Sequence, residues 1–185
     1  MYEEEKEAVL KKYNKGIVFV YTGNGKGKTT AALGLALRAL GHGCKVFVVQ
    51  FMKGRDYGEV LSTKQFLPNL IIYQSGLDSF VMKDNPSPVD IELARQGLEV
   101  AKKAITSGEF DMVILDEINV ALDFKLVPLE EVVELIKTKP PELDLGLTGR
   151  YAPPEIIELA DLVTEMVEIK HPYHQGAPAR KGFEY

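Results

Sequence analysis

The sequence contains no tryptophan, one cysteine and only three histidines among its 185 residues. A single cysteine, Cys44, cannot form an internal disulfide bond, which fits a reducing compartment. His171 and His174 are three residues apart, a spacing that is compatible with a metal site, but no cysteine or acid cluster accompanies them. We interpret both as ordinary histidines of the C-terminal tail.

Long apolar runs and an excess of basic residues are also missing. No stretch approaches the roughly 18 to 20 apolar residues that a membrane-spanning helix needs, and residues 1–7 are too acidic and polar for a secretory signal. The 27 Asp and Glu residues outnumber the 22 Lys and Arg residues, and the net charge of -5 argues against a general nucleic-acid binder. We expect a cytoplasmic protein that acts on small molecules, with no membrane or nucleic-acid partner.

The segment 23–30, Gly-Asn-Gly-Lys-Gly-Lys-Thr-Thr, is the most informative part of the chain. It lies between a β-branched apolar segment at 16–21 and an Ala- and Leu-rich segment at 30–40, which predicts the order strand, glycine-rich loop, helix. Glycines let backbone N–H groups turn toward a polyphosphate, Lys28 adds positive charge, and Thr29 offers a hydroxyl to Mg²⁺. The predicted nucleotide-phosphate site consists of Gly23, Asn24, Gly25, Lys26, Gly27, Lys28, Thr29 and Thr30.

This loop departs from the general phosphate-loop pattern at one position. The pattern has a glycine five residues before Gly27, where this chain has Thr22, so the loop counted from Gly23 is one residue short. The alternative interpretation is a Gly- and Lys-rich surface turn. A surface turn, however, leaves the position between a strand and a helix unexplained.

Apolar segments alternate with helical patterns along the rest of the chain. Strands are predicted at 16–21, 45–51, 70–73, 112–115, 143–148 and 162–169, and helices at 30–40, 90–106, 129–137 and just after Pro154, with a short one within 52–67. Asp90 is the predicted cap of its helix, and the long connection at 75–89 is a candidate functional loop. The alternation predicts an α/β fold with a mainly parallel sheet, helices on both faces, and ligands at the carboxyl ends of the strands.

The chain is predicted to form one globular domain with a short arm. Its 45% hydrophobic and 26% charged residues are ordinary proportions for a globular protein with a core. Residues 3–13 have a short helical pattern, which Asn14, Lys15 and Gly16 end. We therefore predict an N-terminal helical arm over 1–14 and a single P-loop nucleotide-binding domain over 15–185.

Two acids, Asp116 and Glu117, come directly after the predicted strand at 112–115. P-loop proteins place a carboxylate at this position, near the Mg²⁺ that also meets the loop threonine. The predicted metal-binding residues are therefore Thr29, Asp116 and Glu117. The alternative is a polar strand end that caps the next helix. In hydrolytic P-loop enzymes a glutamate here often orients water, so the motif alone suggests an ATPase.

Arg150 is a further candidate, because it follows the predicted strand at 143–148. Its guanidinium could bind a phosphate, whereas an arginine in this position is equally often part of a surface ion pair. Both interpretations stay open, and we count Arg150 among the candidate nucleotide-binding residues.

Taken in order, these motifs resemble those of the ATP:corrinoid adenosyltransferases that act on cob(I)yrinic acid a,c-diamide and cob(I)alamin. The resemblance covers nearly the whole chain, and the shortened phosphate loop supports it. Several of the motifs are weak alone, but their joint order is specific. They lie at 22–30, 41–43, 48–51, 53–54, 115–117, 128–132, 148–150, 158–161 and in the tail from 170 to 185.

The resemblance implies a RecA-like P-loop fold, a homodimer and a transferase of cobalamin biosynthesis. ATP is expected to bind the loop in reversed orientation, so that its 5′ carbon faces the corrinoid. The cobalt(I) of the reduced corrinoid attacks this carbon, and inorganic triphosphate leaves. Lys28, Thr29 and the loop amides are expected to stabilise the leaving group with Mg²⁺ or Mn²⁺ near Asp116 or Glu117. Glu117 is then expected to act on the metal rather than on water.

The resemblance also implies an apolar patch below the corrin ring, which removes the lower axial ligand and eases the formation of cobalt(I). Related members have an aromatic pair in the segment that matches 76–82, and Phe80 aligns with the first of the pair. Met82 stands where the best-known members have tryptophan, and methionine fills a similar apolar volume but stacks differently. For Phe80 the alternative is a loop anchor packed in the core. The low potential of cobalt(I) points to an electron-donor protein, such as a flavodoxin, as a partner.

Two other functions compete with the transferase. A P-loop ATPase or small-molecule kinase would use the same loop and the same two acids, and would yield phosphate or a phosphorylated acceptor. A non-enzymatic ATP-binding regulator would bind ATP tightly without turnover. The product discriminates between them, because only the transferase releases triphosphate.

Overall fold

The computed structural model describes residues 15–79 and 81–185. The predicted N-terminal arm over 1–14 and the corrinoid-site candidate Phe80 lie outside these described residues. Within the described ranges, no helix combines the length and the apolar composition that crossing a membrane requires.

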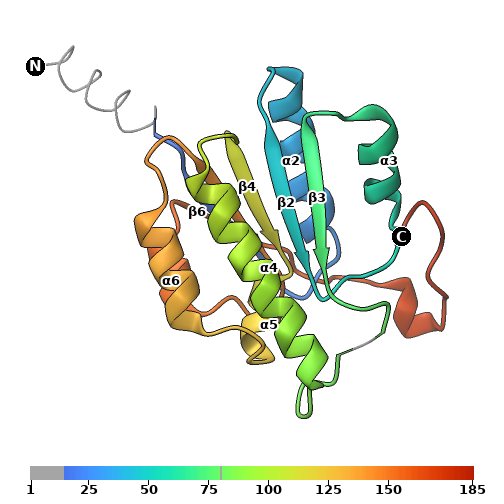
Figure 1. Cartoon of the computed structure of the whole chain (residues 1–185). Coiled ribbons are helices and arrows are strands. Elements are labelled where there is room, and N and C mark those ends of the chain that lie inside the picture. The colour runs from blue at the N-terminus through green and yellow to red at the C-terminus, as the bar shows by residue number, and fades with distance from the viewer. Residues whose placement is uncertain (1–14, 80) are drawn as a thin grey trace, which may run out of the picture.

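The described residues contain a six-stranded sheet in which every strand pair runs parallel (Figure 1). The strands are β1 (Val18–Thr22), β2 (Val46–Phe51), β3 (Leu70–Ser75), β4 (Met112–Asp116), β5 (Asp144–Thr148) and β6 (Leu162–Glu165). Their order across the sheet is β3-β2-β4-β5-β1-β6, so the chain crosses over two strands between β1 and β2. The predicted parallel sheet of an α/β fold is confirmed.

The strand register brings four strand ends together at one edge of the sheet. Gln50 of β2 pairs with Asp116 at the end of β4, and Thr148 at the end of β5 pairs with Tyr21 of β1. Because β2, β4, β5 and β1 are neighbours in this order, the residues that follow them lie close together. The loop after β1 and the acids after β4 therefore meet.

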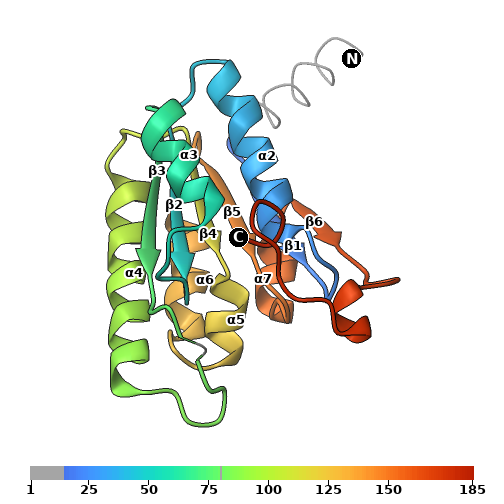
Figure 2. The ribbon, with the colours of Figure 1, turned by 90° about the vertical axis from the view of Figure 1, so that its right-hand side faces the viewer.

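Helices cover both faces of the sheet, as predicted (Figures 1 and 2). They are α2 (Lys28–Gly41), α3 (Gly58–Phe66), α4 (Pro88–Thr106), α5 (Ile118–Asp123), α6 (Leu129–Thr138), α7 (Pro154–Leu159) and the 3₁₀ turn η1 (Pro172–Gln175). Buried residues of α4, α5, α6 and α7 pack on one face, and those of α2 pack on the other. Helix α3 contacts β3, the strand at the sheet edge.

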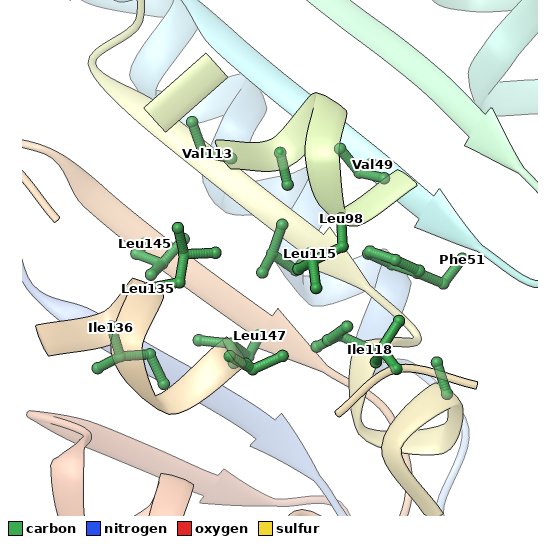
Figure 3. Packing of buried hydrophobic residues seen from close by; sticks show 14 of the residues in the cluster. Val49, Phe51, Leu98, Val113, Leu115, Ile118, Leu135, Ile136, Leu145 and Leu147 are labelled. Carbon is green, nitrogen blue, oxygen red and sulfur yellow. The ribbon is translucent and has the colours of Figure 1, made fainter. Parts of the chain in front are cut away.

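Alternate residues of each strand point to opposite faces, which gives one hydrophobic cluster on each face. The cluster under α4 and α6 includes Val49, Phe51, Leu98, Val113, Leu115, Ile118, Leu135, Ile136, Leu145 and Leu147 (Figure 3). Full burial of one such side chain contributes about 1.5–3 kcal/mol relative to its exposure. The strands therefore form a well-packed platform that fixes the positions of their carboxyl ends.

The start of α4 differs from the prediction. The N-cap is Ser87 and the helix begins at Pro88, so Asp90 is not the cap. Asp90 N–H donates to Ser87 Oγ at 3.2 Å, and Ser87 N–H donates to Asp90 Oδ2 at 3.0 Å, which forms a capping box. Proline suits the first helical position because it has no N–H that would need a partner.

The end of β6 and the short helix α5 also differ from the prediction. β6 ends at Glu165 rather than at residue 169, and Ile169 is 95% exposed. The N–H of the next residue, Met166, still donates to the Thr22 carbonyl of β1 at 2.8 Å, but its carbonyl accepts from Gly25 N–H in the loop after β1 at 2.6 Å, and the strand ends here. Helix α5 was not predicted, since six residues are too few to show a helical period.

Candidate active site

The phosphate loop joins β1 to α2, as the sequence predicted. Gly27 caps α2 with a φ of 114°, a conformation that glycine adopts without steric penalty. The first turn of α2 follows the loop directly, and its unpaired N–H groups favour an anion. The local backbone is therefore suited to bind phosphate.

Two glycines let this loop lie against the backbone of Met166. Gly25 donates its N–H to the Met166 carbonyl, and a Cβ atom added to Gly25 would lie 2.8 Å from the same oxygen. Gly23 has a φ of 92°, and a Cβ atom added to it would lie closer still to the Met166 carbonyl oxygen. An L-amino acid with a side chain would have to push the loop away from β6 at either position.

Lys28 is folded back onto the loop and is only 7% exposed. Its Nζ donates hydrogen bonds to the carbonyl oxygens of Gly23 at 2.9 Å and Gly25 at 2.7 Å. Burial lowers the pKa of Lys28, although the nearby carboxylate of Glu117 opposes this shift. The loop carbonyls therefore hold an ammonium group that phosphate oxygens could take over.

Asp116 lies at the centre of the site and is 1% exposed. Its Oδ1 accepts hydrogen bonds from Thr29 Oγ1 at 2.8 Å and Thr148 Oγ1 at 2.7 Å. Its Oδ2 accepts from Lys53 Nζ at 2.8 Å and Gln50 Nε2 at 3.3 Å. Burial alone would raise the pKa of Asp116, but the Lys53 ammonium and these hydrogen bonds outweigh it and lower the pKa below its usual value. The carboxylate is therefore charged, and it contacts the loop threonine.

Glu117 has a φ of 63°, which is uncommon for a residue other than glycine and is one kind of backbone strain that clusters at active sites. Its N–H donates to Thr148 Oγ1 at 3.0 Å, and its side chain lines the cavity above the loop. Burial and the neighbouring Asp116 carboxylate raise the pKa of Glu117, whereas Lys53 and Lys28 oppose this shift.

Four residues of the site had no role in the sequence-based prediction. Gln50, Lys53 and Thr148 had been included only as parts of family motifs, and Glu59 had not been named. Gln50 is fully buried, and its Nε2 also donates to Glu59 Oε1 at 2.9 Å, which connects α3 to the Asp116 network. A polar residue near the end of the otherwise apolar strand β2 was the signal that could have identified this position.

A cavity of about 1030 Å³ opens above the phosphate loop. Part of its wall comes from Tyr57 and from the C-terminal residues 182–185. Its cationic lining consists of Lys26, Lys28, Lys53, Lys83 and Arg150. Glu59, Glu117 and Glu184 also line the cavity, so the cations exceed the acids, and this excess next to a helix N-terminus suits an anionic ligand.

Most of the residues predicted for the site meet at this cavity. The lining includes Gly25, Lys26, Gly27, Lys28, Thr29, Thr30, Glu117 and Arg150. Gly23 and Asn24 belong to the loop but do not line the cavity. Met82 is 69% exposed and does not line it, although its neighbour Lys83 does.

The two histidines of the C-terminal tail have different surroundings. His171 lines the cavity, whereas His174 contacts Glu168 Oε1 through Nε2 at 2.6 Å. Across residues 15–79 and 81–185, no group of three or more His, Cys, Asp or Glu side chains is arranged to hold a metal ion.

Comparison with known proteins identifies the family. A family model described as ATP:corrinoid adenosyltransferase BtuR/CobO/CobP matches residues 14–185. The corrinoid adenosyltransferase of Escherichia coli (strain K12) is 39% identical over 172 residues, which are 92% of this chain and 86% of that relative. A Sinorhizobium protein of the same name is 40% identical over 184 residues, 98% of this chain and 86% of the relative. The corrinoid adenosyltransferase CobA of Salmonella typhimurium is 36% identical over 172 residues, 92% of this chain and 86% of the relative. These matches confirm the resemblance found in the sequence: this chain belongs to the ATP:corrinoid adenosyltransferase family.

Proposed function

We propose that this protein transfers the 5′-deoxyadenosyl group of ATP to the cobalt(I) of a reduced corrinoid and releases inorganic triphosphate. One observation carries the proposal: in a chain of this family, Lys28 and Thr29 of the phosphate loop line one cavity, and Thr29 also bonds the buried Asp116 behind it. ATP supplies the group that is transferred, and the corrinoid accepts it.

The proposed reaction is a displacement at carbon. The cobalt(I) electron pair forms a bond to C5′ of ATP while the bond between C5′ and its oxygen breaks, and triphosphate leaves with that electron pair. The corrinoid is itself the nucleophile, so no side chain has to remove a proton. The protein contributes by orienting C5′ toward the cobalt and by neutralising the leaving triphosphate.

Lys28 and the loop N–H groups other than that of Gly25, which donates to the Met166 carbonyl, are proposed to bind the triphosphate. The Lys28 ammonium contacts only loop carbonyls among its described hydrogen-bond partners, so rotation of one side chain transfers it to a phosphate oxygen. Lys26 and Arg150 line the same cavity and add positive charge. Such preorganised charge favours a state in which negative charge develops on the leaving oxygen.

Thr29, Asp116 and Glu117 are proposed to hold Mg²⁺ or Mn²⁺ together with the phosphates. The Thr29 hydroxyl donates a hydrogen bond to Asp116 Oδ1 at 2.8 Å, so the lone pairs of the hydroxyl oxygen point away from that carboxylate. In proteins Mg²⁺ usually binds one or two carboxylates together with substrate phosphates, and this set of side chains fits that pattern. When bound, the ion neutralises charge on the triphosphate.

The corrinoid and partner assignments depend mainly on the family resemblance. Met82 is exposed and therefore accessible to a ligand, but it does not line the cavity, so its proposed place near the corrin ring rests on the resemblance. Phe80 keeps its proposed role below the ring on the resemblance alone. A homodimer, a cytoplasmic location, a flavodoxin as electron donor, an arm over 1–14 and a single domain over 15–185 are further parts of this proposal.

The direct test mixes the protein with ATP, Mg²⁺ and chemically reduced cobalamin in the absence of oxygen. We expect the absorbance of a new cobalt–carbon bond and an equal amount of triphosphate. Absence of both products would refute the proposed function. Phosphate release without a change in the corrinoid would instead identify an ATPase, and tight ATP binding without turnover would identify a regulator.

A further inference from the structure

A lysine that follows β2 occupies the position of a cation in the proposed metal site. Lys53 Nζ lies 2.8 Å from Asp116 Oδ2 and 3.5 Å from Thr29 Oγ1. The side chain of Lys53 is 15% exposed and that of Asp116 is 1% exposed. The ammonium group therefore lies between the two side chains whose oxygens the proposed function assigns to the metal.

The direction of the hydrogen bonds explains why a cation is held there. The single proton of the Thr29 hydroxyl is donated to Asp116 Oδ1, so the Thr29 oxygen can only accept toward Lys53. Asp116 Oδ2 accepts from Lys53 and from Gln50. A buried carboxylate without a positive partner is strongly destabilising, and Lys53 supplies that partner when the site holds no ligand.

We infer that Lys53 is a built-in counter-ion that keeps divalent metal ions out of the nucleotide-free site and moves onto the triphosphate when metal and ATP bind together. This inference rests on the proposed function, because it requires the metal to bind at Thr29 and Asp116. An ammonium and a divalent ion a few ångströms apart repel each other unless an anion separates them. The triphosphate is that anion, so the metal enters as a metal–ATP complex.

Lys53 can move in this way without a change in the fold. Its side chain already lines the cavity beside Lys28 and the loop. The backbone next to it is fixed, because Gly54 packs so closely on the carbonyl of Gly76 that a Cβ atom would not fit. The flexible four-carbon side chain lets the ammonium exchange Asp116 for a phosphate oxygen while the backbone stays in place. The Tyr57 ring, whose centroid is 5.2 Å from Nζ, is a further partner of this ammonium.

Mn²⁺ tests the inference, because electron paramagnetic resonance follows its binding without any turnover. Without ATP, the K53M variant is expected to bind Mn²⁺ about tenfold or more tightly than the wild-type protein, since one competing positive charge is gone. Lys64→Met is the matched control, because Lys64 pairs with the exposed Asp56 at 3.5 Å and does not line the cavity. We expect K64M to keep the Mn²⁺ affinity of the wild-type protein.

Equal Mn²⁺ affinities of K53M and wild type would overturn the inference. If K53M does not fold, Lys53→Gln is measured in its place. Mn²⁺ binding by the wild-type protein, with and without ATP, is a second test. Wild-type protein that binds Mn²⁺ only when ATP is added supports the inference, and wild-type protein that binds it equally well without ATP overturns it. Adenosylation of cobalamin together with either overturning result would refute only the role of Lys53. Absence of adenosylation would refute the proposed function itself.

Discussion

The Thr148 hydroxyl donates a 2.7 Å hydrogen bond to Oδ1 of Asp116. The same hydroxyl accepts the N–H of Glu117 at 3.0 Å, so one side chain contacts both acids of the site. Thr148 is fully buried at the end of β5, and β5 pairs directly with β4, which ends at Asp116. Strand residues Thr148 and Gln50 therefore hold one side of the Asp116 carboxylate each, and Thr29 and Lys53, which lie outside the strands, complete its contacts.

Replacing Thr148 by valine tests this contact. Valine keeps the shape of the side chain but removes the acceptor of the Glu117 N–H and one of the two hydroxyl donors to Asp116 Oδ1, which costs about 1–3 kcal/mol. We expect T148V to lose that much free energy of unfolding in a urea titration and to lose adenosylation activity as well. Thr138→Val is the control, because Thr138 bonds only the Glu134 carbonyl on the exposed side of α6. Wild-type stability of T148V would show that the Thr148 bridge is not needed.

Lys28→Met tests the role of the loop lysine in phosphate binding. Loss of a charged hydrogen bond costs about 1.5–3 kcal/mol, which corresponds to roughly 10- to 100-fold weaker binding of Mg²⁺–ATP in calorimetry. Lys45→Met is the matched control. Lys45 is exposed and precedes the amino end of β2, whereas the site lies at the carboxyl ends of the strands. An ATP affinity of K28M close to that of K45M would exclude Lys28 as a phosphate-binding residue.

The phosphate loop was predictable because its residue types determine both its backbone and its charge. Gly23, Gly25 and Gly27 permit the close and left-handed conformations that the structure contains, and Lys28 and Thr29 follow at fixed spacing. Alternating apolar and helical patterns were equally sufficient to predict the parallel sheet. These properties depend on neighbouring residues in the chain, which a sequence shows directly.

The network around Asp116 could not be predicted in the same way. Thr148 and Lys53 reach Asp116 only because β5 and β2 are the two neighbours of β4 in the sheet. Local sequence patterns predict strands but not their order in the sheet. The end of β6 depends likewise on the contact between Met166 and Gly25, which are distant in sequence. At the start of α4, Ser87 and Asp90 are both good capping residues, and the intervening proline decided between them.

Gly25→Ala tests the close approach of the loop to β6. An added Cβ would meet the Met166 carbonyl at 2.8 Å, so the loop must shift, at a cost of about 1–3 kcal/mol for such overpacking. We expect weaker ATP binding and a lower melting temperature. Gly34→Ala is the control, because a Cβ on this glycine of α2 would have nothing within 4 Å, and alanine there is expected to stabilise the helix by about 0.5–1 kcal/mol. Unchanged ATP affinity of G25A would mean that the loop tolerates the shift.

Glu117→Gln tests the electrostatics of the second acid through the pH dependence of stability. Burial and the Asp116 carboxylate raise the pKa of Glu117 above its ordinary value of 4.5. A carboxyl group with a raised pKa binds its proton more tightly in the folded than in the unfolded protein. Its ionisation therefore destabilises the fold as the pH rises from the unfolded-state pKa through the folded-state pKa, whereas below the unfolded-state pKa this cost is absent.

Glutamine has no proton to lose, so the E117Q variant avoids this cost at every pH. In urea titrations of the nucleotide-free protein with a chelator present, we expect the stability of E117Q relative to wild type to increase as the pH rises from the ordinary pKa of 4.5 through the raised pKa of Glu117. Glu109→Gln removes a carboxyl from an exposed loop residue and controls for the loss of one negative charge. A stability difference between E117Q and wild type that stays constant over this range would mean that Glu117 ionises at no cost to the fold. The acid would then have enough water or positive charge around it in the ligand-free protein to offset its burial and the Asp116 carboxylate.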